Sequence, residues 1–428
     1  MVWIHGGAFV CGSSRTDVYG PEFLMSQDIV LVTINYRVGL LGFLSFKDSS
    51  VDVPGNAGLK DQVVALQWVK KFIHQFNGDS NNITLFGQDA GAASVHLHML
   101  SPLSTGLFQK VIMQSGCALN PWVNGLRGNG RLVGKVLNIQ GTDANIFEKL
   151  KVLDVKEIFR AQEELANDNR VDVLWLCSPI VERKHLSGSF LTDEPINLIK
   201  VGKYAKVPTI IGYTSREAYF KSIIPNNLKC KKGSLLSYTI ADKVEQFYYG
   251  PRMQRTRMGR YPRFRRMDPL YQLITDVFFL KGIFMTVKHH LEMAAKVPLY
   301  YYKFCYENTL STFKQATRPL HRRKYPGAVH GDDLGYFFDS YLTPDIYFED
   351  ENDIAIQNIG QLWTSFARTG QPTISCDNKI TLKWKPTTKD SFHCLLIGPD
   401  IKKEYNPDMD RMLFWKKIYE NDKRTKDL

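Results

Sequence analysis

The stretch ITLFGQDAGAASVHLHML, residues 83–100, decides how this chain is expected to fold. It begins with an apolar run typical of a buried strand and continues, after Gln88, as a helical pattern that opens on small residues. A strand that turns sharply into a helix at G-x-S-x-G is the layout of a nucleophile elbow. Residues 87–91 read Gly-Gln-Asp-Ala-Gly, so Asp89 stands where the motif has Ser, and the amide of Ala90 follows it.

Two further motifs belong to the same arrangement. The segment HGGAF, residues 5–9, resembles the HGG-type loop that supplies oxyanion-hole amides, and its glycines let the backbone approach a reacting carbonyl. Downstream, Glu217 lies in SREA (residues 215–218) and His330 lies in GAVHGD (residues 327–332). The chain order of nucleophile position, acid and histidine is the α/β-hydrolase order.

Seven collinear segments carry a resemblance to a known family. Beside residues 83–100 they are VWIHGGAFVCGS, INYRVGLLGFLS, VPGNAGLKDQVVALQWV, GLFQKVIMQSGCALNPW, VHGDDLGYFF and LWTSFARTGQPT. They resemble the type B carboxylesterases, the cholinesterase-like group, and most of all the insect α-esterases. The resemblance implies an α/β-hydrolase fold, with a mostly parallel central sheet, helices on both faces and helical cap insertions.

The resemblance also implies roles for the catalytic motifs. Glu217 would be the acid and His330 the base of a catalytic triad whose nucleophile position is Asp89. The residues implied as oxyanion-hole donors are Gly7, Ala8 and Ala90. The substrates would be small hydrophobic esters, and no cofactor is implied.

Three more residues receive a role from the same resemblance. Trp122 and Phe9 would line the substrate pocket, and Ser115 would be a buried helper near the acid. The pair His96 and His98 has the H-x-H spacing of some metal sites. Residues i and i+2 of a helix do not face each other, and no third ligand is evident, so we expect no metal there.

Asp89 changes the expected chemistry. An ionised carboxylate could attack an ester carbonyl, but the tetrahedral adduct would expel this weaker base and collapse backward. We therefore expect a carboxylesterase-family pseudoenzyme with weak or absent ester hydrolysis, since loss of the triad nucleophile leaves only residual catalysis. One alternative is a non-catalytic ligand-binding, sequestering or adhesion-type protein. Another is a hydrolase of epoxides or alkyl halides in which Asp89 is the nucleophile and His330 activates water.

The chain is expected to form one domain over residues 1–428. Length alone suggests two or three domains, but the collinear motifs favour a single carboxylesterase domain with insertions. Relatives carry a sizeable segment before the HGG loop, whereas here that loop begins at residue 5. We therefore expect this domain to lack its N-terminal segment.

Charge and cysteine content limit the partners and the compartment. The net charge of +12 is concentrated in Arg252–Arg266, which suggests either a nucleic-acid or membrane patch or a solvated insertion. No nucleic-acid-binding signature accompanies the run, so we expect a solvated insertion and no nucleic-acid partner. The seven cysteines are scattered and show no disulfide framework, which favours an intracellular location. Cys376 and Cys394 could nevertheless form a disulfide bond. No apolar run reaches the ~18 residues of a membrane span. The oligomeric state is left open.

Short apolar runs alternate with helical patterns, which favours a parallel sheet with helices on both faces. The expected strands are Val2–Ile4, Ile29–Asn35, Ile83–Gly87, Lys110–Gln114, Pro208–Gly212, Pro298–Cys305 and His393–Ile397. Helices are expected after Gly58 and after Asp89, and over Leu150–Asn167, Leu270–Ala295, Asp350–Arg368 and Met409–Glu420. Of these, Leu150–Asn167 and Leu270–Ala295 are assigned to a cap over the site.

Overall fold

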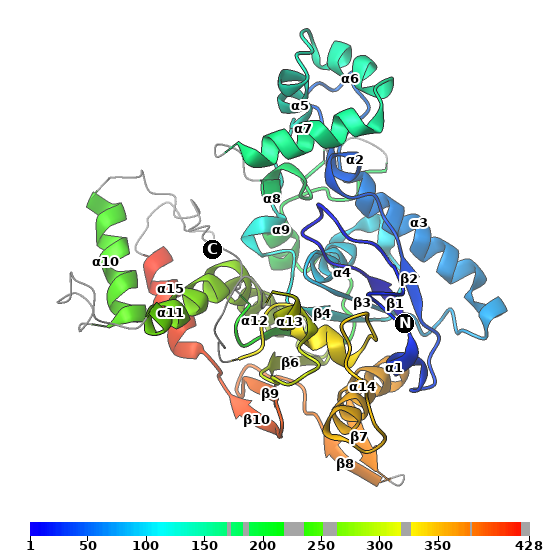
Figure 1. The fold of residues 1–428 in the computed structure, drawn as a ribbon, viewed down its shortest axis with the longest axis vertical. Helices are drawn as coiled ribbons and strands as arrows, with labels where there is room; N and C mark the ends of the chain where they lie inside the picture. Colours follow the sequence, from blue (N-terminus) through cyan, green and yellow to red (C-terminus); the bar gives the residue numbers. More distant parts are fainter. Residues whose placement is uncertain are drawn as a thin grey trace.

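A mostly parallel sheet forms the centre of the protein (Figure 1). The computed structural model describes residues 1–168, 173–182, 188–217, 235–250, 263–317, 327–376 and 379–420. Eight strands are ordered β10-β9-β6-β5-β4-β3-β1-β2, and every neighbouring pair is parallel except β9 with β10. They are β1 Val2–Ile4, β2 Val32–Ile34, β3 Thr84–Gln88, β4 Lys110–Gln114, β5 Thr209–Thr214, β6 Leu299–Phe304, β9 His393–Ile397 and β10 Ile401–Tyr405. A separate antiparallel hairpin joins β7 Thr373–Cys376 to β8 Lys379–Lys383.

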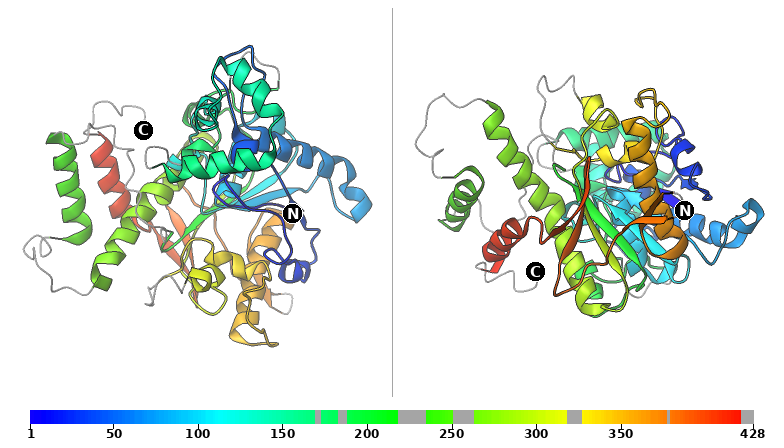
Figure 2. Two further views of the ribbon diagram at one scale, coloured as in Figure 1. Left: turned by 45° about the horizontal axis from the view of Figure 1, so that its top comes forward. Right: turned by 90° about the horizontal axis from the view of Figure 1, so that it is seen from below.

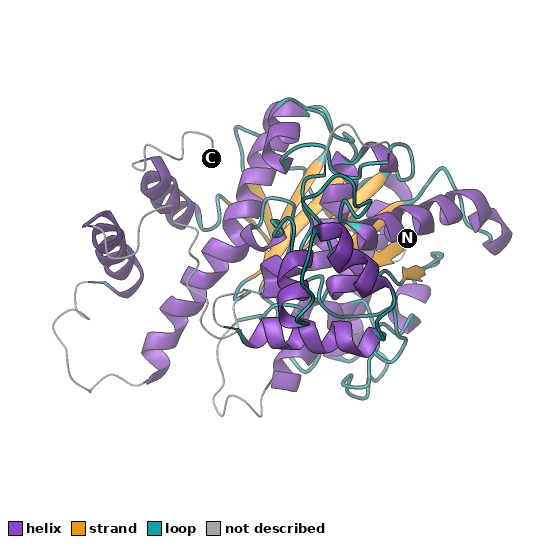
Figure 3. Cartoon of the chain, turned by 90° about the horizontal axis from the view of Figure 1, so that it is seen from above, coloured by secondary structure: helices purple, strands orange, loops and turns teal. Residues whose placement is uncertain are grey.

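Helices surround this sheet on both sides (Figure 3). The α-helices are α1 Glu22–Met25, α2 Gly39–Phe43, α3 Ala57–Phe72, α4 Ala90–Leu100, α5 Gly130–Val136, α6 Asp143–Lys151, α7 Val155–Asn167, α8 Val173–Leu176, α9 Pro195–Lys200, α10 Leu235–Tyr249, α11 Arg263–Thr275, α12 Lys281–Met293, α13 Thr312–Thr317, α14 Glu351–Thr369 and α15 Met409–Glu420. Four 3₁₀ turns, η1 Ile73–Phe76, η2 Pro102–Ser104, η3 Pro121–Val123 and η6 Asp332–Tyr336, and one π-helical turn, η4 Asp276–Leu280, complete the elements used below.

The strands distribute their side chains to two apolar layers because successive residues of a strand point to opposite faces. In β1, Val2 and Ile4 join the layer that holds α3, α4 and α12, whereas Trp3 joins the layer that holds α1 and α14. Both faces of the sheet are therefore covered, as parallel sheets require. This arrangement confirms the predicted α/β-hydrolase fold class.

Several predicted boundaries are wrong. The helix predicted over Leu150–Asn167 is two helices, α6 and α7. The chain leaves helical geometry after α6, and Asp154 starts α7 by accepting a hydrogen bond from the amide of Lys156, at 2.9 Å. The strand predicted over Ile29–Asn35 is shortened to β2, and the sequence patterns did not predict β7, β8 or β10. Helices α5, α6 and α7 form a group that stands away from the sheet (Figures 1 and 2).

The segment predicted as a cap helix, Leu270–Ala295, is mainly a core helix. It is the continuous run α11–η4–α12, in which α12 packs on β5 and β6. Residues Asp268–Met293 are long and apolar enough to cross a membrane by length and composition, and half of their most apolar window is buried inside the protein. Asp276 in this run is fully buried and paired with Arg411 at 3.0 Å, an arrangement that suits a core helix.

Candidate active site

The elbow that carries Asp89 has the strained geometry that a nucleophile position needs. Asp89 joins β3 to α4 with φ 57° and ψ −122°, and its amide donates to the carbonyl of Gln114 on β4 at 2.9 Å. Such backbone angles are rare for a non-glycine residue and persist only where the surroundings enforce them. A Cβ at Gly91 would lie 2.0 Å from the carbonyl oxygen of Ile4, so only glycine lets α4 approach β1 here.

The HGG loop presents its amides to the Asp89 carboxylate. Gly7, Ala8 and Phe9 all have positive φ, at 115°, 54° and 62°, and so form a concave turn of backbone N–H groups. Oδ2 of Asp89 accepts hydrogen bonds from the amides of Gly7, at 2.9 Å, and Ala8, at 2.8 Å. Among the described residues these are the backbone donors to this carboxylate, while Ala90 is the buried first residue of α4. The carboxylate therefore occupies two of the three predicted oxyanion amides.

The loop that carries His330 is fixed by its neighbours. Oδ2 of Asp332 accepts from the amide of Val329 at 2.7 Å, and the hydroxyl of Ser215 accepts from the amide of Ala328 at 3.0 Å. Arg216, two residues after β5, forms an isolated parallel β-bridge with Val329. These bonds hold the histidine loop against the end of β5, where Glu217 follows.

The structure brings Asp89, Glu217 and His330 together. Nδ1 of His330 lies 2.6 Å from Oε2 of Glu217, and Nε2 lies 3.5 Å from Oδ1 of Asp89. Glu217 is fully buried and its Oε1 accepts from the amide of Thr214 at 2.6 Å, whereas the side chains of Asp89 and His330 keep 14% and 12% of their surface exposed. The imidazole thus lies between two carboxylates, and its outer side is reachable from solvent.

Electrostatics make Asp89 and His330 an ionised pair. Burial opposes charge on His330, but its hydrogen bonds to Asp89 and Glu217 and their negative charges outweigh burial and raise its pKa to about 10. Burial likewise opposes charge on Asp89, but His330 and the amides of Gly7 and Ala8 lower the pKa of that carboxyl. At neutral pH His330 is an imidazolium and has no lone pair with which to accept a proton.

Gln88 is a site residue that sequence reasoning missed. Its amide nitrogen, Nε2, lies 2.9 Å from Nε2 of His330. The amide nitrogen is a donor, so this orientation suits a neutral Nε2 of His330, and a protonated Nε2 requires the Gln88 amide to be turned so that its oxygen accepts. The orientation of the Gln88 amide is thus linked to the protonation of His330. Gln88 directly precedes the nucleophile position, and this neighbouring place in the motif was the one indication in the sequence that it belongs to the site.

A second missed residue is Phe279, whose ring centroid lies 4.9 Å from that of His330. Phe279 belongs to the π-helical turn η4, and such turns frequently mark functional sites. Nδ2 of Asn120 donates to the carbonyls of Phe278 and Phe279, at 2.7 and 2.9 Å, and Nε1 of Trp122 also donates to Phe278, at 3.1 Å. Periodicity could not reveal this turn, because an added residue in a helical turn leaves no compositional signature.

The predicted pocket residues form an aromatic wall beside His330. The ring of Trp122 lies 5.9 Å from that of Phe279 and 6.4 Å from that of Phe9. Both Trp122 and Phe9 are buried. Ser115 is buried as well, with φ 55°, and among the described residues its hydroxyl has no hydrogen-bond partner. The Ser115 hydroxyl therefore makes no hydrogen bond to Glu217.

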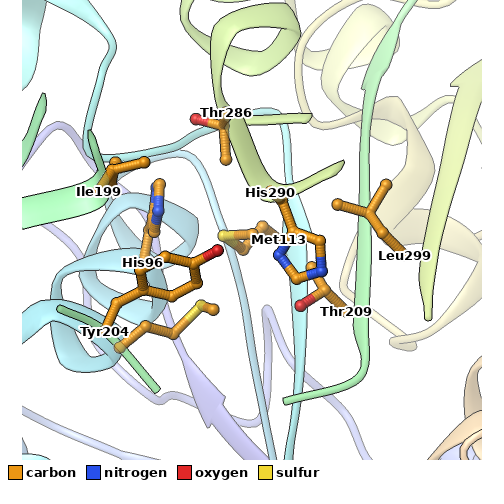
Figure 4. A pocket seen from close by; sticks show the side chains of 9 residues that line it. His96, Met113, Ile199, Tyr204, Thr209, Thr286, His290 and Leu299 are labelled. Carbon is orange, nitrogen blue, oxygen red and sulfur yellow. The ribbon is translucent and has the colours of Figure 1, made fainter. Parts of the chain in front are cut away.

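The two histidines of the H-x-H pair point to different places. His98 contacts Ser104 and Gln62, at 2.7 and 2.9 Å. His96 accepts from the amide of Ala118 at 3.1 Å and, with His290, lines a cavity of about 10 Å³ between α4 and α12 (Figure 4). Burial lowers the pKa of His96 and His98 to about 3, so both stay neutral. Within the described ranges, no group of three or more His, Cys, Asp or Glu side chains that could hold a metal ion occurs.

Two other sequence predictions receive partial answers. Cys376 and Cys394 are both free thiols, one exposed and one buried, so they do not form the disulfide considered above. Most of the basic segment Arg252–Arg266 lies outside the described residues, and its last residues open α11.

Comparisons with known proteins agree with this fold. Residues 1–415 match the carboxylesterase family, and the chain belongs to that family. Esterase B1 of Culex pipiens is 29% identical over 452 residues, which cover 99% of this chain and 81% of that protein. Juvenile hormone esterase of Tribolium castaneum is 32% identical over 419 residues, covering 90% and 68%. The predicted resemblance to insect esterases is thereby confirmed.

Two further relatives define the extent of the match. Bile salt-activated lipase of Homo sapiens is 32% identical over 421 residues, and the chain spans 53% of its length. The crystal structure of juvenile hormone esterase from Manduca sexta, with OTFP covalently attached, superposes with a TM-score of 0.79 at 26% identity, covering 98% of this chain and 80% of that one.

Proposed function

We propose that this protein keeps the ligand-binding scaffold of a carboxylesterase but turns over carboxylic esters weakly or not at all. The observation that supports this most strongly is the position of the Asp89 carboxylate. One oxygen accepts hydrogen bonds from the amides of Gly7 and Ala8, and the other forms an ion pair with the imidazolium of His330. The groups that would stabilise an oxyanion and accept a proton are thus engaged with each other.

The ligand class follows from the pocket wall. Trp122, Phe9 and Phe279 offer aromatic surface beside a buried ion pair, which suits a small hydrophobic ester or a similarly shaped neutral molecule. Esterase and lipase relatives support a ligand of this kind. Such a protein would bind or sequester esters that its serine-bearing relatives hydrolyse.

The test compares the protein with His330→Gln, using 1-naphthyl acetate as substrate. If the site does not catalyse ester hydrolysis, both proteins release naphthol at the same low rate. The proposal fails if the unmodified protein hydrolyses the ester with saturation kinetics and the variant loses that rate, because His330 would then be acting in catalysis.

A second candidate is supported by the carboxylate oxygen that faces His330 and accepts no backbone amide of the described residues. Oδ2 of Asp89 is fixed by two amides, which leaves Oδ1, 3.5 Å from Nε2 of His330, available to attack a saturated carbon. With an epoxide, Oδ1 would form a C–O bond, the ring C–O bond would break, and the imidazolium would protonate the alkoxide. The Asp89 ester is uncharged, so the pKa of His330 would fall, and the neutral imidazole would then activate water against that ester.

This second candidate has its own test. After a single turnover of styrene oxide in ¹⁸O-water, the peptide that contains Asp89 would gain ¹⁸O, which mass spectrometry detects. An unlabelled peptide together with unchanged styrene oxide excludes the candidate, and His330→Gln is the control that should trap the alkyl-enzyme.

A further inference from the structure

A cavity behind the aromatic wall forms a second candidate site. It has a volume of about 420 Å³, within the ~300–1,000 Å³ range of small-molecule sites. Its walls come from α4, η3, α9, α12 and residues 179–181, and η4 adds Val277. Neither Asp89 nor His330 lines it, so it is distinct from the candidate active site.

The lining of the cavity is mainly apolar, and its exceptions are the polar residues Asn120, Asn124 and Tyr419 and two charged groups. Side chains from four elements contribute the hydrocarbon surface, among them Leu97, Val123, Ile180, Ile196 and Met285. The charged groups are Lys281, the first residue of α12, and Glu194, which precedes α9. A cavity of this kind would accept an elongated apolar molecule with one polar end.

Lys281 is a half-buried cation with no acidic partner among the described residues. Its Nζ lies 3.3 Å from the centre of the Tyr419 ring, so an aromatic face, and not a carboxylate, is the contact that the described residues give it. No carboxylate of the described residues lies within 4 Å of it, whereas Lys303 is paired with Asp408 at 2.8 Å. Burial lowers the pKa of Lys281 to about 8, which reflects the same lack of a compensating charge.

We propose that this cavity binds an apolar monocarboxylate, with the carboxylate at Lys281 and the hydrocarbon chain along the apolar wall. The ligand would supply the missing counter-charge, and its chain would bury apolar surface. A carboxylate on an ammonium is a charge-assisted contact, the stronger kind of hydrogen bond. The site is independent of Asp89.

The probe is dodecanoate, with dodecanol as the uncharged probe of equal chain length, and binding is measured by calorimetry on the whole chain. Lys281→Met keeps the length of the side chain and removes the charge. We expect it to weaken dodecanoate binding about 10-fold or more, the effect of one charge-assisted bond, and to leave dodecanol binding unchanged. Lys288→Met, at an exposed position of the same helix, is the matched control and should not change either affinity.

Two further variants separate binding from folding. Lys281→Arg keeps the charge and should retain dodecanoate binding, and Ile196→Trp fills the cavity and should weaken both probes. Dodecanoate affinity should fall between pH 7 and 9.5 as Lys281 loses its proton. Glu194, whose carboxyl pKa is raised by burial and by Asp193, also lines the cavity, and Tyr419, whose pKa burial raises to about 12, stays neutral over that range. Equal dodecanoate affinity in Lys281→Met, or no saturable binding by the unmodified protein, would overturn the proposal.

Discussion

Oδ1 of Asp89 lies 3.5 Å from Nε2 of His330, while Oδ2 of the same carboxylate accepts the amides of Gly7 and Ala8. The side chain of Asp89 therefore binds both the predicted base and two predicted oxyanion-hole donors. In a serine esterase the same imidazole is neutral and takes the proton of the nucleophile. The proposed difference in chemistry rests on this ion pair between Asp89 and His330.

The first prediction concerns the ionisation of His330. In the unmodified protein its imidazolium signal should persist to about pH 10 in an NMR titration. In Asp89→Ser the pKa should fall, because one of its two carboxylate partners is removed. His74, which is exposed, is an internal reference in the same spectra. A His330 that is neutral at pH 7 in the unmodified protein would contradict the ion pair.

A second prediction links this pKa to stability. An unfolded histidine titrates near ~6.5, so the folded protein holds one extra proton between about pH 7 and 10. The stabilising effect is complete below the unfolded pKa and is lost as the pH rises through the folded value. The free energy of unfolding should fall over this range by up to about 1.4 kcal/mol per pH unit for this group. Urea titrations should show a shallower fall for Asp89→Ser, and parallel curves would refute the linkage.

The elbow gives a prediction about packing. Gly91→Ala would place a Cβ 2.0 Å from the carbonyl oxygen of Ile4, so either α4 or β1 must move. We expect a loss of about 1–3 kcal/mol, the usual cost of overpacking. The matched control is Gly360→Ala in α14, where the nearest atom would lie at 3.5 Å and a better helix former should be neutral or stabilising. Equal urea midpoints for the two variants would argue against this close approach.

The π-helical turn gives another prediction. Asn120→Ala removes the donor to the carbonyls of Phe278 and Phe279, and only Phe278 keeps a side-chain donor, Nε1 of Trp122. We expect a loss of about 1–3 kcal/mol in the free energy of unfolding. Asn197→Ala, which removes an exposed contact to Asp193, should cost far less. If both substitutions have the same small effect in urea unfolding, Asn120 does not hold this turn.

Sequence reasoning anticipated the parts of the site that have local signatures. The elbow, the HGG loop and the histidine loop each combine glycines with a fixed spacing, so Asp89, Gly7 and His330 could be found before their contacts were known. It also predicted the strands β1, β4 and β9 at their observed bounds, because short apolar runs between turn residues are unambiguous.

The missed parts depend on tertiary contacts. Phe279, in the π turn, contacts His330 from more than 50 residues earlier in the chain, and Gln88 matters because the segment that carries His330 lies beside the end of β3. The break between α6 and α7 depends on Asp154 as a cap, which a search for helical periodicity passes over. The edge strand β10 is formed of exposed and half-buried residues, so its pattern lacks a strong apolar signal.

We propose that Asp89 alone prevents ordinary ester hydrolysis, and the rate of aryl-ester hydrolysis by Asp89→Ser tests this most directly. A serine at this position would free the amides of Gly7 and Ala8, let His330 act as a base, and supply an alkoxide that leaves less readily than a phenolate. Asp89→Ala and the double variant Asp89→Ser/His330→Gln are controls that should remain inactive.

We predict that Asp89→Ser raises kcat/KM for 1-naphthyl acetate by about 10²-fold or more, equivalent to about 2.7 kcal/mol of transition-state stabilisation. An unmodified protein already as fast as the serine variant would show that Asp89 is a competent nucleophile toward esters. An inactive but correctly folded serine variant would show that Asp89 is not the only obstacle. Either result would contradict the account.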